Sequence, residues 1–516
     1  MLNLSANAHL WLNVVLGLYL AGLLGLSVYA SKKVKNEEDY LVAGRSLPLF
    51  LSWGALMATW FGTSAIMGAS KNAREEGLIG TVLDPWSCSA TLLLAGLFFA
   101  RPLWRMKLFT IGDFYRNYYG HKAEFVACAI QVPIFFCWIA AQFIGLAEVQ
   151  QRIYGIDHNK GILIAAAITL VYTLIGGMWS VTLTDALQIG VALVGLVALG
   201  YATFSHLGQG SFTAGLDHLL SHTESHHLTL LPKPGVFAVL TWLGTWATGL
   251  FGNIPGQDLQ QRIFAAKDEK TARWACLLAS GLYLAFGLIP VALGLASRLT
   301  HQGPVEGGVL LHMAGSYLSP PLVIVFVLAV VSIIVSVATS ATIAPATILA
   351  RNLLEPLGLL PDRHLLLDRL CVVAVTLGAI AMAFTGESIM GLLDIQLSLA
   401  MVTLFVPLVM GLWGKPRGEL AGFLPMFLGG SCWLARYLLE KILLPLPPEV
   451  AQLQDYPHYI AGQFPAERVG TLAHQVLHLV ALVPADVVGL VASFSGYFLG
   501  QWLCRKNATH RDAPGA

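Results

Sequence analysis

The sequence has few charged residues. Lys and Arg number 30 and Asp and Glu number 29 among 516 residues, so only 11% of the chain is charged, against roughly 25% in soluble domains. The formal net charge is +1, and no basic block is present to neutralise phosphates, which argues against a nucleic-acid partner. Hydrophobic residues make up 56% of the chain. This composition indicates an integral membrane protein that contacts the lipid bilayer.

Cysteine is scarce as well, and signatures of catalysis are missing. The 7 cysteines are scattered singly without a CxxC pair, so we interpret them as small buried hydrophobic side chains. The sequence has no HExxH motif, no Ser/His/Asp cluster and no paired carboxylates, so we do not expect an enzyme. A short polar tail follows the last apolar run, and no attached soluble domain is expected.

Apolar runs near the roughly 20 residues that cross a bilayer predict about thirteen transmembrane segments. The first is followed by a charged loop, so we interpret it as a span and not as a cleaved signal. Most of the 30 positively charged residues fall in loops on one side. By the positive-inside rule, this predicts a plasma (cytoplasmic) membrane protein with its N-terminus outside and its C-terminus in the cytoplasm. The predicted segments are 9–30, 48–69, 79–100, 124–149, 160–178, 184–204, 234–256, 274–297, 320–348, 367–386, 389–412, 419–440 and 478–502.

Two of these segments are interrupted by small residues. Residues 53–69 include Gly62, Thr63 and Ser64, and residues 242–257 include several glycines and Pro255. The first run alone has two interpretations, a packing face or a locally opened helix whose carbonyls face a cavity. The pair together is typical of an inverted-repeat transporter, so we expect 58–63 and 249–257 to be unwound and to face one another across a polar hollow.

A third stretch, 172–188, joins two segments through a short loop. Gly176 and Gly177 allow a helix to stop, and Asp185 with Gln188 is predicted to cap the next helix. The pattern Gly-Gly-x-x-Ser-Val-x-x-Thr-Asp-x-x-Gln in this stretch, together with residues 38–47 and 110–115, resembles the sodium:solute symporter family over about residues 38–352. Residues 96–102, 254–262 and 350–352 are most similar to its high-affinity choline transporter branch.

The resemblance implies an all-α polytopic membrane protein with a leucine-transporter-type 5+5 inverted repeat and broken helices in segments 2 and 7. The expected function is a secondary active transporter that imports a small organic solute by alternating access with a cation. A transporter-like sensor without flux is the alternative. The domains implied are an N-terminal extra helix and inside loop (1–46), a first repeat (47–204), an outside loop (205–233), a second repeat (234–412), and two peripheral helices with an outside loop and a short cytoplasmic tail (413–516).

The resemblance also implies a sodium site made of backbone carbonyls and hydroxyls, for which the matching residues are Ala58, Phe61, Ile333 and Ser336. The family's second hydroxyl position is Val337 here, which offers no oxygen, and a missing ligand costs about 1–3 kcal/mol if it resembles an unmade hydrogen bond. Water or Thr339 is a possible substitute. Proton coupling is the alternative, with Asp84 and Asp394 as candidate relays because lone carboxylates inside a membrane are often functional.

For the solute, Trp60 and Trp138 match two positions of the choline branch's aromatic cage, in which each cation–π contact contributes up to about 2 kcal/mol. The cage is incomplete, since Gly256 and Cys88 replace an expected Trp and Tyr. A quaternary ammonium and another small solute, such as an amino acid or a carboxylate, both remain open. The predicted substrate-binding residues are Trp60, Thr63, Trp138 and Gln257.

The loop 205–233 is rich in histidine. The spacing of His218, His222 and His226 would place three imidazoles on one helical face for zinc. Gly, Ser and Thr around them favour a coiled surface loop instead.

Overall fold

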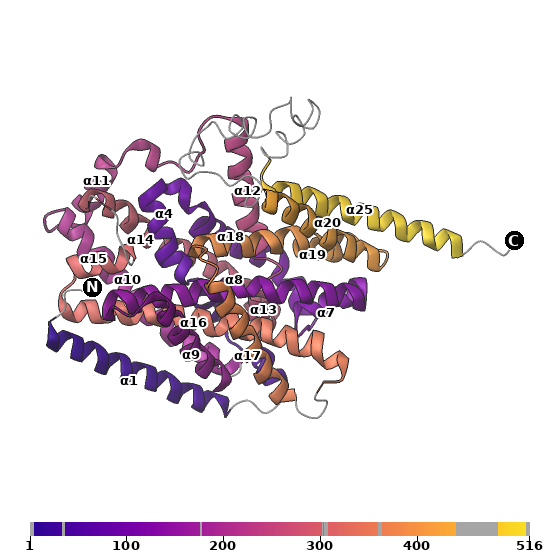
Figure 1. The fold of residues 1–516 in the computed structure, drawn as a ribbon, viewed down its shortest axis with the longest axis horizontal. Coiled ribbons are helices and arrows are strands. Elements are labelled where there is room, and N and C mark those ends of the chain that lie inside the picture. Colours follow the sequence, from indigo (N-terminus) through magenta and orange to yellow (C-terminus); the bar gives the residue numbers. More distant parts are fainter. Residues whose placement is uncertain are drawn as a thin grey trace. The chain divides into compact units, whose positions relative to one another are not determined.

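The computed structural model describes residues 5–32, 37–175, 178–301, 303, 308–359, 364–439 and 483–511. The regular structure in these ranges is helical, apart from one isolated bridge between Leu47 and Ala266 (Figure 1). Ten of the described helices are long and apolar enough to cross a membrane, or eleven if a bent pair in segment 2 is one span. The count of thirteen stays a prediction, because the helices in 234–256 and 419–440 are not among these.

The chain forms two compact units, and the first comprises Met1–Asp113, Cys128–Leu230 and Gly256–Gln396. Its helices and helical turns are α1 (Ala6–Ser31), α2 (Glu37–Val42), η1 (Ala43–Arg45), α3 (Leu49–Trp60), η2 (Ser64–Gly68), α4 (Ala69–Glu76), η3 (Leu78–Thr81), η4 (Val82–Ser87), α5 (Cys88–Leu94), η5 (Ala95–Phe99), α6 (Ala100–Arg105), α9 (His158–Ile175), α10 (Met178–Leu207), α11 (Phe212–His222), η6 (Ser225–His227), α13 (Gln257–Ala265), α14 (Glu269–Thr300), α15 (Val309–Tyr317), α16 (Pro320–Ile348), η7 (Leu349–Leu354), η8 (Glu355–Leu357) and α17 (His364–Ala383). Helices α7 (Ile111–Tyr119), α8 (His121–Tyr154) and α18 (Ile389–Ala400) begin in one unit and end in the other.

The second unit comprises Phe114–Ala127, Leu231–Pro255 and Leu397–Ala516. It contains α12 (Val236–Gly252), η9 (Met401–Phe405), α19 (Val406–Trp413), α20 (Glu419–Leu438) and α25 (Ala485–Arg511). Helices α20 and α25 pack closely at Gly500, which has no side chain. A Cβ at this position would lie 2.4 Å from the Leu420 carbonyl oxygen. Small residues at such contacts bring membrane helices together. The predicted outside loop between these two helices lies outside the described residues.

Helix α16 is the centre of the first unit. Every residue from Phe326 to Ile348 is buried, whereas α1 is mostly exposed. A helix buried on all sides occupies the middle of a bundle. The polar side chains that α16 carries therefore face neighbouring helices and not lipid.

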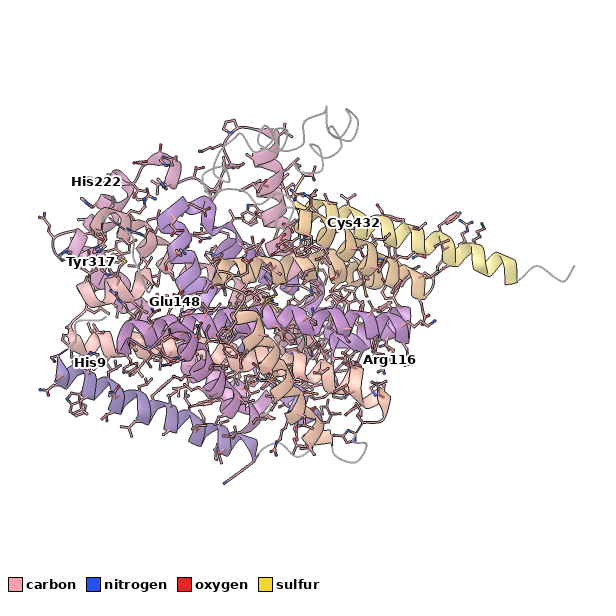
Figure 2. All side chains as sticks on the ribbon, viewed as in Figure 1. His9, Arg116, Glu148, His222, Tyr317 and Cys432 are labelled. Carbon is pink, nitrogen blue, oxygen red and sulfur yellow. The ribbon has the colours of Figure 1, made fainter. Side chains whose placement is uncertain are left out.

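Two local predictions about α10 and α11 are wrong. Asp185 lies inside α10, two turns after its start at Met178, so it does not cap the helix; Gly176 and Gly177 lie outside the described residues. The stretch expected to be coil contains α11, which Ser211 caps and which buries Gly215 and Leu219 on one face. Because α11 ends at His222 (Figure 2), His226 cannot share a helical face with the two earlier histidines.

Candidate functional site

The helix of segment 2 breaks after Trp60. Phe61 has φ −75° and ψ 75°, and the chain resumes as a helix at Ser64 in a direction that differs by 60°. Gly62 is required here because a Cβ would lie 2.9 Å from the Gln142 side-chain oxygen and 3.1 Å from a Val337 methyl. Helices α8 and α16 therefore approach the backbone closely at the break. The helical structure of the seventh predicted segment is also interrupted, between Gly252 and Gln257.

Gln142 of α8 hydrogen-bonds the polar groups that the break leaves without partners. Its Oε1 accepts hydrogen bonds from the Thr63 backbone N–H (3.0 Å) and from the Thr63 hydroxyl (2.7 Å). The first N–H groups of a helix have no partner within that helix, so Gln142 supplies one from outside. Gly145 leaves space for Thr63, since a Cβ there would lie 2.3 Å from the Thr63 methyl. A single Gln in an apolar run has no distinctive pattern, and sequence analysis missed it.

Trp60 hydrogen-bonds a buried group of charged side chains. Its indole Nε1 donates to Asp258 Oδ2 at 2.7 Å, across 198 residues of sequence. Arg262, one turn after Asp258 on α13, is buried with 2% of its surface exposed and attracts both Asp258 and Asp185. Two carboxylates and one guanidinium carry a formal charge of −1. None of these three charged residues was predicted as part of a site.

The predicted ion-site residues lie beside this group. The Ser336 hydroxyl lies 3.3 Å from the Ala58 carbonyl oxygen and also hydrogen-bonds Asp185 Oδ1. Ser340, one turn further on α16, donates to Asp185 Oδ2 at 3.3 Å. Ala58 and Ser336 are thus brought together, and the carboxylate between the two serines is one that sequence analysis assigned to a cap.

The other predicted ion-site positions have varied surroundings. Phe61 is fully buried at the break, and Ile333 is buried on α16 one turn before Val337. Val337 directs its methyl groups towards Gly62. The hydroxyl of Thr339 donates to the Val335 carbonyl of its own helix at 2.8 Å, which fixes its hydrogen and leaves its oxygen lone pairs able to bind a cation.

Asp84 forms a second buried carboxylate centre. Its Oδ2 accepts from the Ser64 hydroxyl (2.7 Å) and its Oδ1 from the Tyr283 hydroxyl (2.9 Å). The same Tyr283 oxygen lies 3.2 Å from the Trp60 carbonyl oxygen, so Asp84 is joined to both sides of the break. Among the described residues no basic side chain bonds Asp84. Asp394, the other candidate relay, is exposed on α18.

Two predicted substrate residues have different environments. Trp138 is buried on α8, one turn before Gln142, whose Nε2 donates to its carbonyl oxygen at 3.3 Å. The Gln257 amide instead contacts the segment before α7, accepting from the Ile111 N–H (2.8 Å) and donating to the Phe109 carbonyl (3.4 Å). The structure therefore gives the Gln257 amide backbone partners, while the next residue, Asp258, contacts the indole of Trp60.

The signature residues near α7 have a structural role. Asp113 Oδ2 accepts from the backbone N–H groups of Phe109 and Thr110, and the Thr110 hydroxyl donates to Asn352 at 2.8 Å. A Cβ at Gly112 would lie 2.7 Å from the Asn352 amide nitrogen. These motif residues join the segment before α7 to the turn that follows α16.

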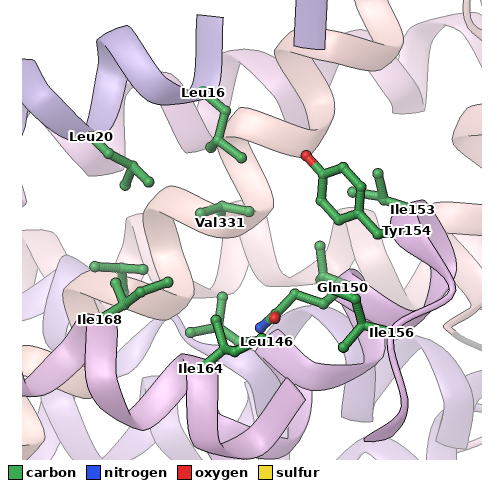
Figure 3. Close-up of a pocket in the computed structure, with 12 residues that line it drawn as sticks. Leu16, Leu20, Leu146, Gln150, Ile153, Tyr154, Ile156, Ile164, Ile168 and Val331 are labelled. Carbon is green, nitrogen blue, oxygen red and sulfur yellow. The ribbon is translucent and has the colours of Figure 1, made fainter. Parts of the chain in front are cut away.

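A cavity of about 220 Å³ lies between α1, α8, α9 and α16 (Figure 3). Its lining is almost entirely apolar and contains none of the predicted site residues; it includes Leu16, Leu146, Ile164 and Val331, with Gln150 as a polar exception. Solute sites contain a few convergent polar groups in an apolar pocket. This cavity lacks that character, whereas several polar groups converge at the break at Phe61–Thr63.

Comparisons with known proteins identify the family of this chain. Residues 40–415 match the model of the sodium:solute symporter family. High-affinity choline transporter 1 of Drosophila melanogaster is 26% identical over 427 residues, which cover 79% of this chain and 67% of the relative. The osmoregulated proline transporter OpuE of Bacillus subtilis is 27% identical over 296 residues, covering 54% of this chain and 58% of the relative.

Solved structures show the same architecture. A Na+-coupled sialic acid symporter in a substrate-bound outward-open state superposes with a TM-score of 0.72 at 15% identity, covering 96% of this chain and 97% of that one. MhsT in complex with L-phenylalanine gives a TM-score of 0.53 at 15% identity, covering 88% and 98%. The predicted all-α, leucine-transporter-type fold is thereby confirmed. The chain belongs to the sodium:solute symporter family and is a cation-coupled secondary transporter.

Proposed function

We propose that this protein imports a small organic cation together with sodium by alternating access. The two inverted repeats, 47–204 and 234–412, would rearrange around the break at Phe61–Thr63. The observation that carries the proposal is the presence of two buried carboxylate centres at this break. Asp185 contacts Ser336, which contacts Ala58, and Asp84 contacts Ser64. Buried charges in a membrane are costly unless they are paired or functional, and each centre has a cation to bind.

Sodium is the cation that we assign to Asp185. The ligands would be this carboxylate, the hydroxyls of Ser336 and Ser340, and the Ala58 carbonyl, with Phe61 and Ile333 as further carbonyl donors. Oxygen ligands of this kind suit a hard cation. The formal charge of −1 on Asp185, Asp258 and Arg262 leaves one positive charge to be supplied. Asp185 would thus supply an oxygen in place of the one that Val337 lacks.

The solute is assigned to the centre at Asp84. A positive amine would neutralise this carboxylate, while Trp60 and Trp138 offer ring faces for cation–π contacts of up to about 2 kcal/mol each. Thr63 and Ser64 add hydroxyls beside the break. The similarity to choline transporters favours the same chemistry, so choline and related amines are the first solutes to test. A proton on Asp84 is the second candidate, because hydroxyl partners tolerate either form of the acid.

Uptake into proteoliposomes tests both assignments. We expect accumulation of an amine from a panel of amines, amino acids, sugars and carboxylates when an inward sodium gradient is imposed, and none when potassium replaces sodium. Accumulation that ignores sodium and collapses when the proton gradient is dissipated would contradict the sodium assignment. Binding of a solute without accumulation would identify a sensor instead.

Asp185→Asn tests the ion site directly. The variant keeps the size of the side chain but removes the charge, and we expect the half-saturating sodium concentration to rise about ten-fold or more, as 1–3 kcal/mol per lost charged contact implies. Asp217→Asn, at an exposed position of α11, is the matched control. Equal sodium dependence in the two variants would exclude Asp185 as a ligand.

A further inference from the structure

Three metal-ligand side chains gather on the short turn after α11. Glu224 precedes the 3-10 turn η6, which ends with His226 and His227. The distance from Glu224 Oε2 to His226 Nδ1 is 3.3 Å and to His227 Nδ1 is 3.8 Å. The two imidazole centroids are 3.9 Å apart. This cluster is separate from the transport site described above.

These separations fit a zinc ion. Zinc binds imidazole nitrogen and carboxylate oxygen at about 2.0–2.2 Å in a tetrahedron, which places ligand atoms about 3.3–3.6 Å from each other. The Glu224–His227 separation needs a contraction of a few tenths of an ångström, and all three ligand atoms lie within 4.8 Å of one another. Two imidazoles and one carboxylate favour zinc over magnesium, which prefers oxygen ligands alone. The fourth position would be left to water.

The turn holds these ligands in place. The backbone N–H of His227 donates to the Glu224 carbonyl at 2.9 Å, and His227 is only 6% exposed. Gly77, with φ +83°, lies against it, and a Cβ there would be 2.6 Å from the His227 Cα. The side chains of Glu224 and His226 are 69% and 63% exposed. An ion can therefore reach a site whose third ligand is fixed against the end of α4.

We propose that Glu224, His226 and His227 form a binding site for Zn²⁺ and that the bound ion slows transport. Helix α4 continues the chain beyond the break at Phe61–Thr63 and ends at Glu76, directly before the glycine that supports the turn. An ion that fixes the turn restrains this half of the broken segment. The effect on transport rests on the proposed function, whereas ion binding does not.

Calorimetric titration of the purified full-length protein with zinc chloride tests the site. We expect one zinc ion to bind and magnesium not to bind. The double variant Glu224→Gln/His226→Ala should lose zinc affinity by about ten-fold or more. Both changes are at exposed positions, so the melting temperature without zinc should be unchanged. The matched control is Asp217→Asn/His222→Ala, which removes one carboxylate and one imidazole from exposed positions of α11. Absence of zinc binding by the unaltered protein, or equal loss in both double variants, overturns the site.

Uptake by proteoliposomes with zinc on both faces tests the consequence. We expect zinc to slow uptake by the unaltered protein and by the Asp217→Asn/His222→Ala control, and to leave uptake by Glu224→Gln/His226→Ala unchanged. Zinc binding without slower uptake overturns the effect on transport and leaves the site established. Absence of uptake in zinc-free buffer counts against the proposed function only, because the titration does not depend on transport.

Discussion

Both carboxylate oxygens of Asp84 accept a hydrogen bond from a hydroxyl group, one from Ser64 and the other from Tyr283. Asp84→Asn keeps the shape but removes the charge and turns one acceptor into a donor. We expect affinity for an amine solute to fall about 10- to 100-fold, since losing a buried charged contact costs about 1–3 kcal/mol. The measurement is solute binding to the purified protein by thermal shift or calorimetry. Unchanged amine affinity, combined with loss of uptake driven by a proton gradient, would assign Asp84 to proton transfer.

Val337 offers the converse experiment. It is fully buried and its methyl groups face Gly62, at the position where the family resemblance implies a hydroxyl ligand. Val337→Thr adds that oxygen with little change in shape, and we expect the half-saturating sodium concentration to fall roughly ten-fold, because one added ligand contributes about 1–3 kcal/mol. Val335→Thr, on the same helix facing the apolar cavity, is the control. If both variants depend on sodium equally, position 337 does not contact the ion.

Helix α15 is attached to its neighbours by hydrogen bonds between the side-chain nitrogens of one arginine and two histidines. Arg152 Nη2 donates to His312 Nδ1 (3.1 Å), and His312 Nε2 lies 3.2 Å from His301 Nδ1. This arrangement uses a neutral imidazole, since a second proton would face the guanidinium. Burial lowers the pKa of His312, and nearby His301, Arg152 and Arg74 lower it further.

The lowered pKa of His312 predicts a pH dependence of stability. Below the ordinary histidine pKa of about 6.5, His312 is protonated in the unfolded chain, whereas in the folded protein it stays neutral until the pH falls to its lowered pKa. Stability contributed here is therefore present above about pH 6.5 and is lost as the pH falls through the folded pKa. His312→Gln preserves a donor and an acceptor but does not titrate, so its melting temperature should fall less than that of the unaltered protein between pH 7.5 and 5.5. Parallel curves would show that His312 has the same pKa in both states.

The positions of the interruptions could be predicted from the sequence because their cause is local, but residues 58–60 and 249–252, predicted to be unwound, are helical, since α3 continues to Trp60 and α12 to Gly252. Gly62 and Thr63 leave one side of the helix open, and Pro255 with Gly256 stops another helix, so the interruptions are visible in short stretches. The partners of Asp185 and Trp60 could not be predicted in this way. Ser336 is 151 residues from Asp185 and Asp258 is 198 residues from Trp60, and a lone polar residue in an apolar run has no spacing that identifies its partner.

The partners of Gln257 and Asp185 lie far away in the sequence. Gln257 is predicted to bind the solute, and in the structure its amide oxygen accepts from the N–H of Ile111 at the start of α7. Asp185 has the residue type and spacing of a cap, but α10 begins earlier, and the carboxylate lies against α16 instead. In both cases the partner is more than a hundred residues away in the sequence, so no local pattern identifies it.

At the scale of the whole molecule, bound sodium should stabilise the fold. An ion that binds only the folded state adds RT ln(1 + [Na+]/Kd), about 2.7 kcal/mol at 100 times Kd. We expect the melting temperature to rise with sodium chloride and not with potassium chloride at equal ionic strength. Asp185→Asn should reduce the difference between the two salts. Identical melting curves in both salts for the unaltered protein would mean that no selective sodium site exists in the solute-free state.

Gln142 links helix α8 to the start of the half-helix beyond the break, because its one oxygen satisfies the amide of Thr63. If α8 moved away during the proposed alternating access, that amide would lose its acceptor in a place where water is scarce, at a cost of about 1–3 kcal/mol. A solute whose own oxygen took over the bond would remove this cost. We expect the cost to discourage the empty carrier from a movement that the loaded carrier completes, so that a single glutamine would help to prevent the ion from crossing alone.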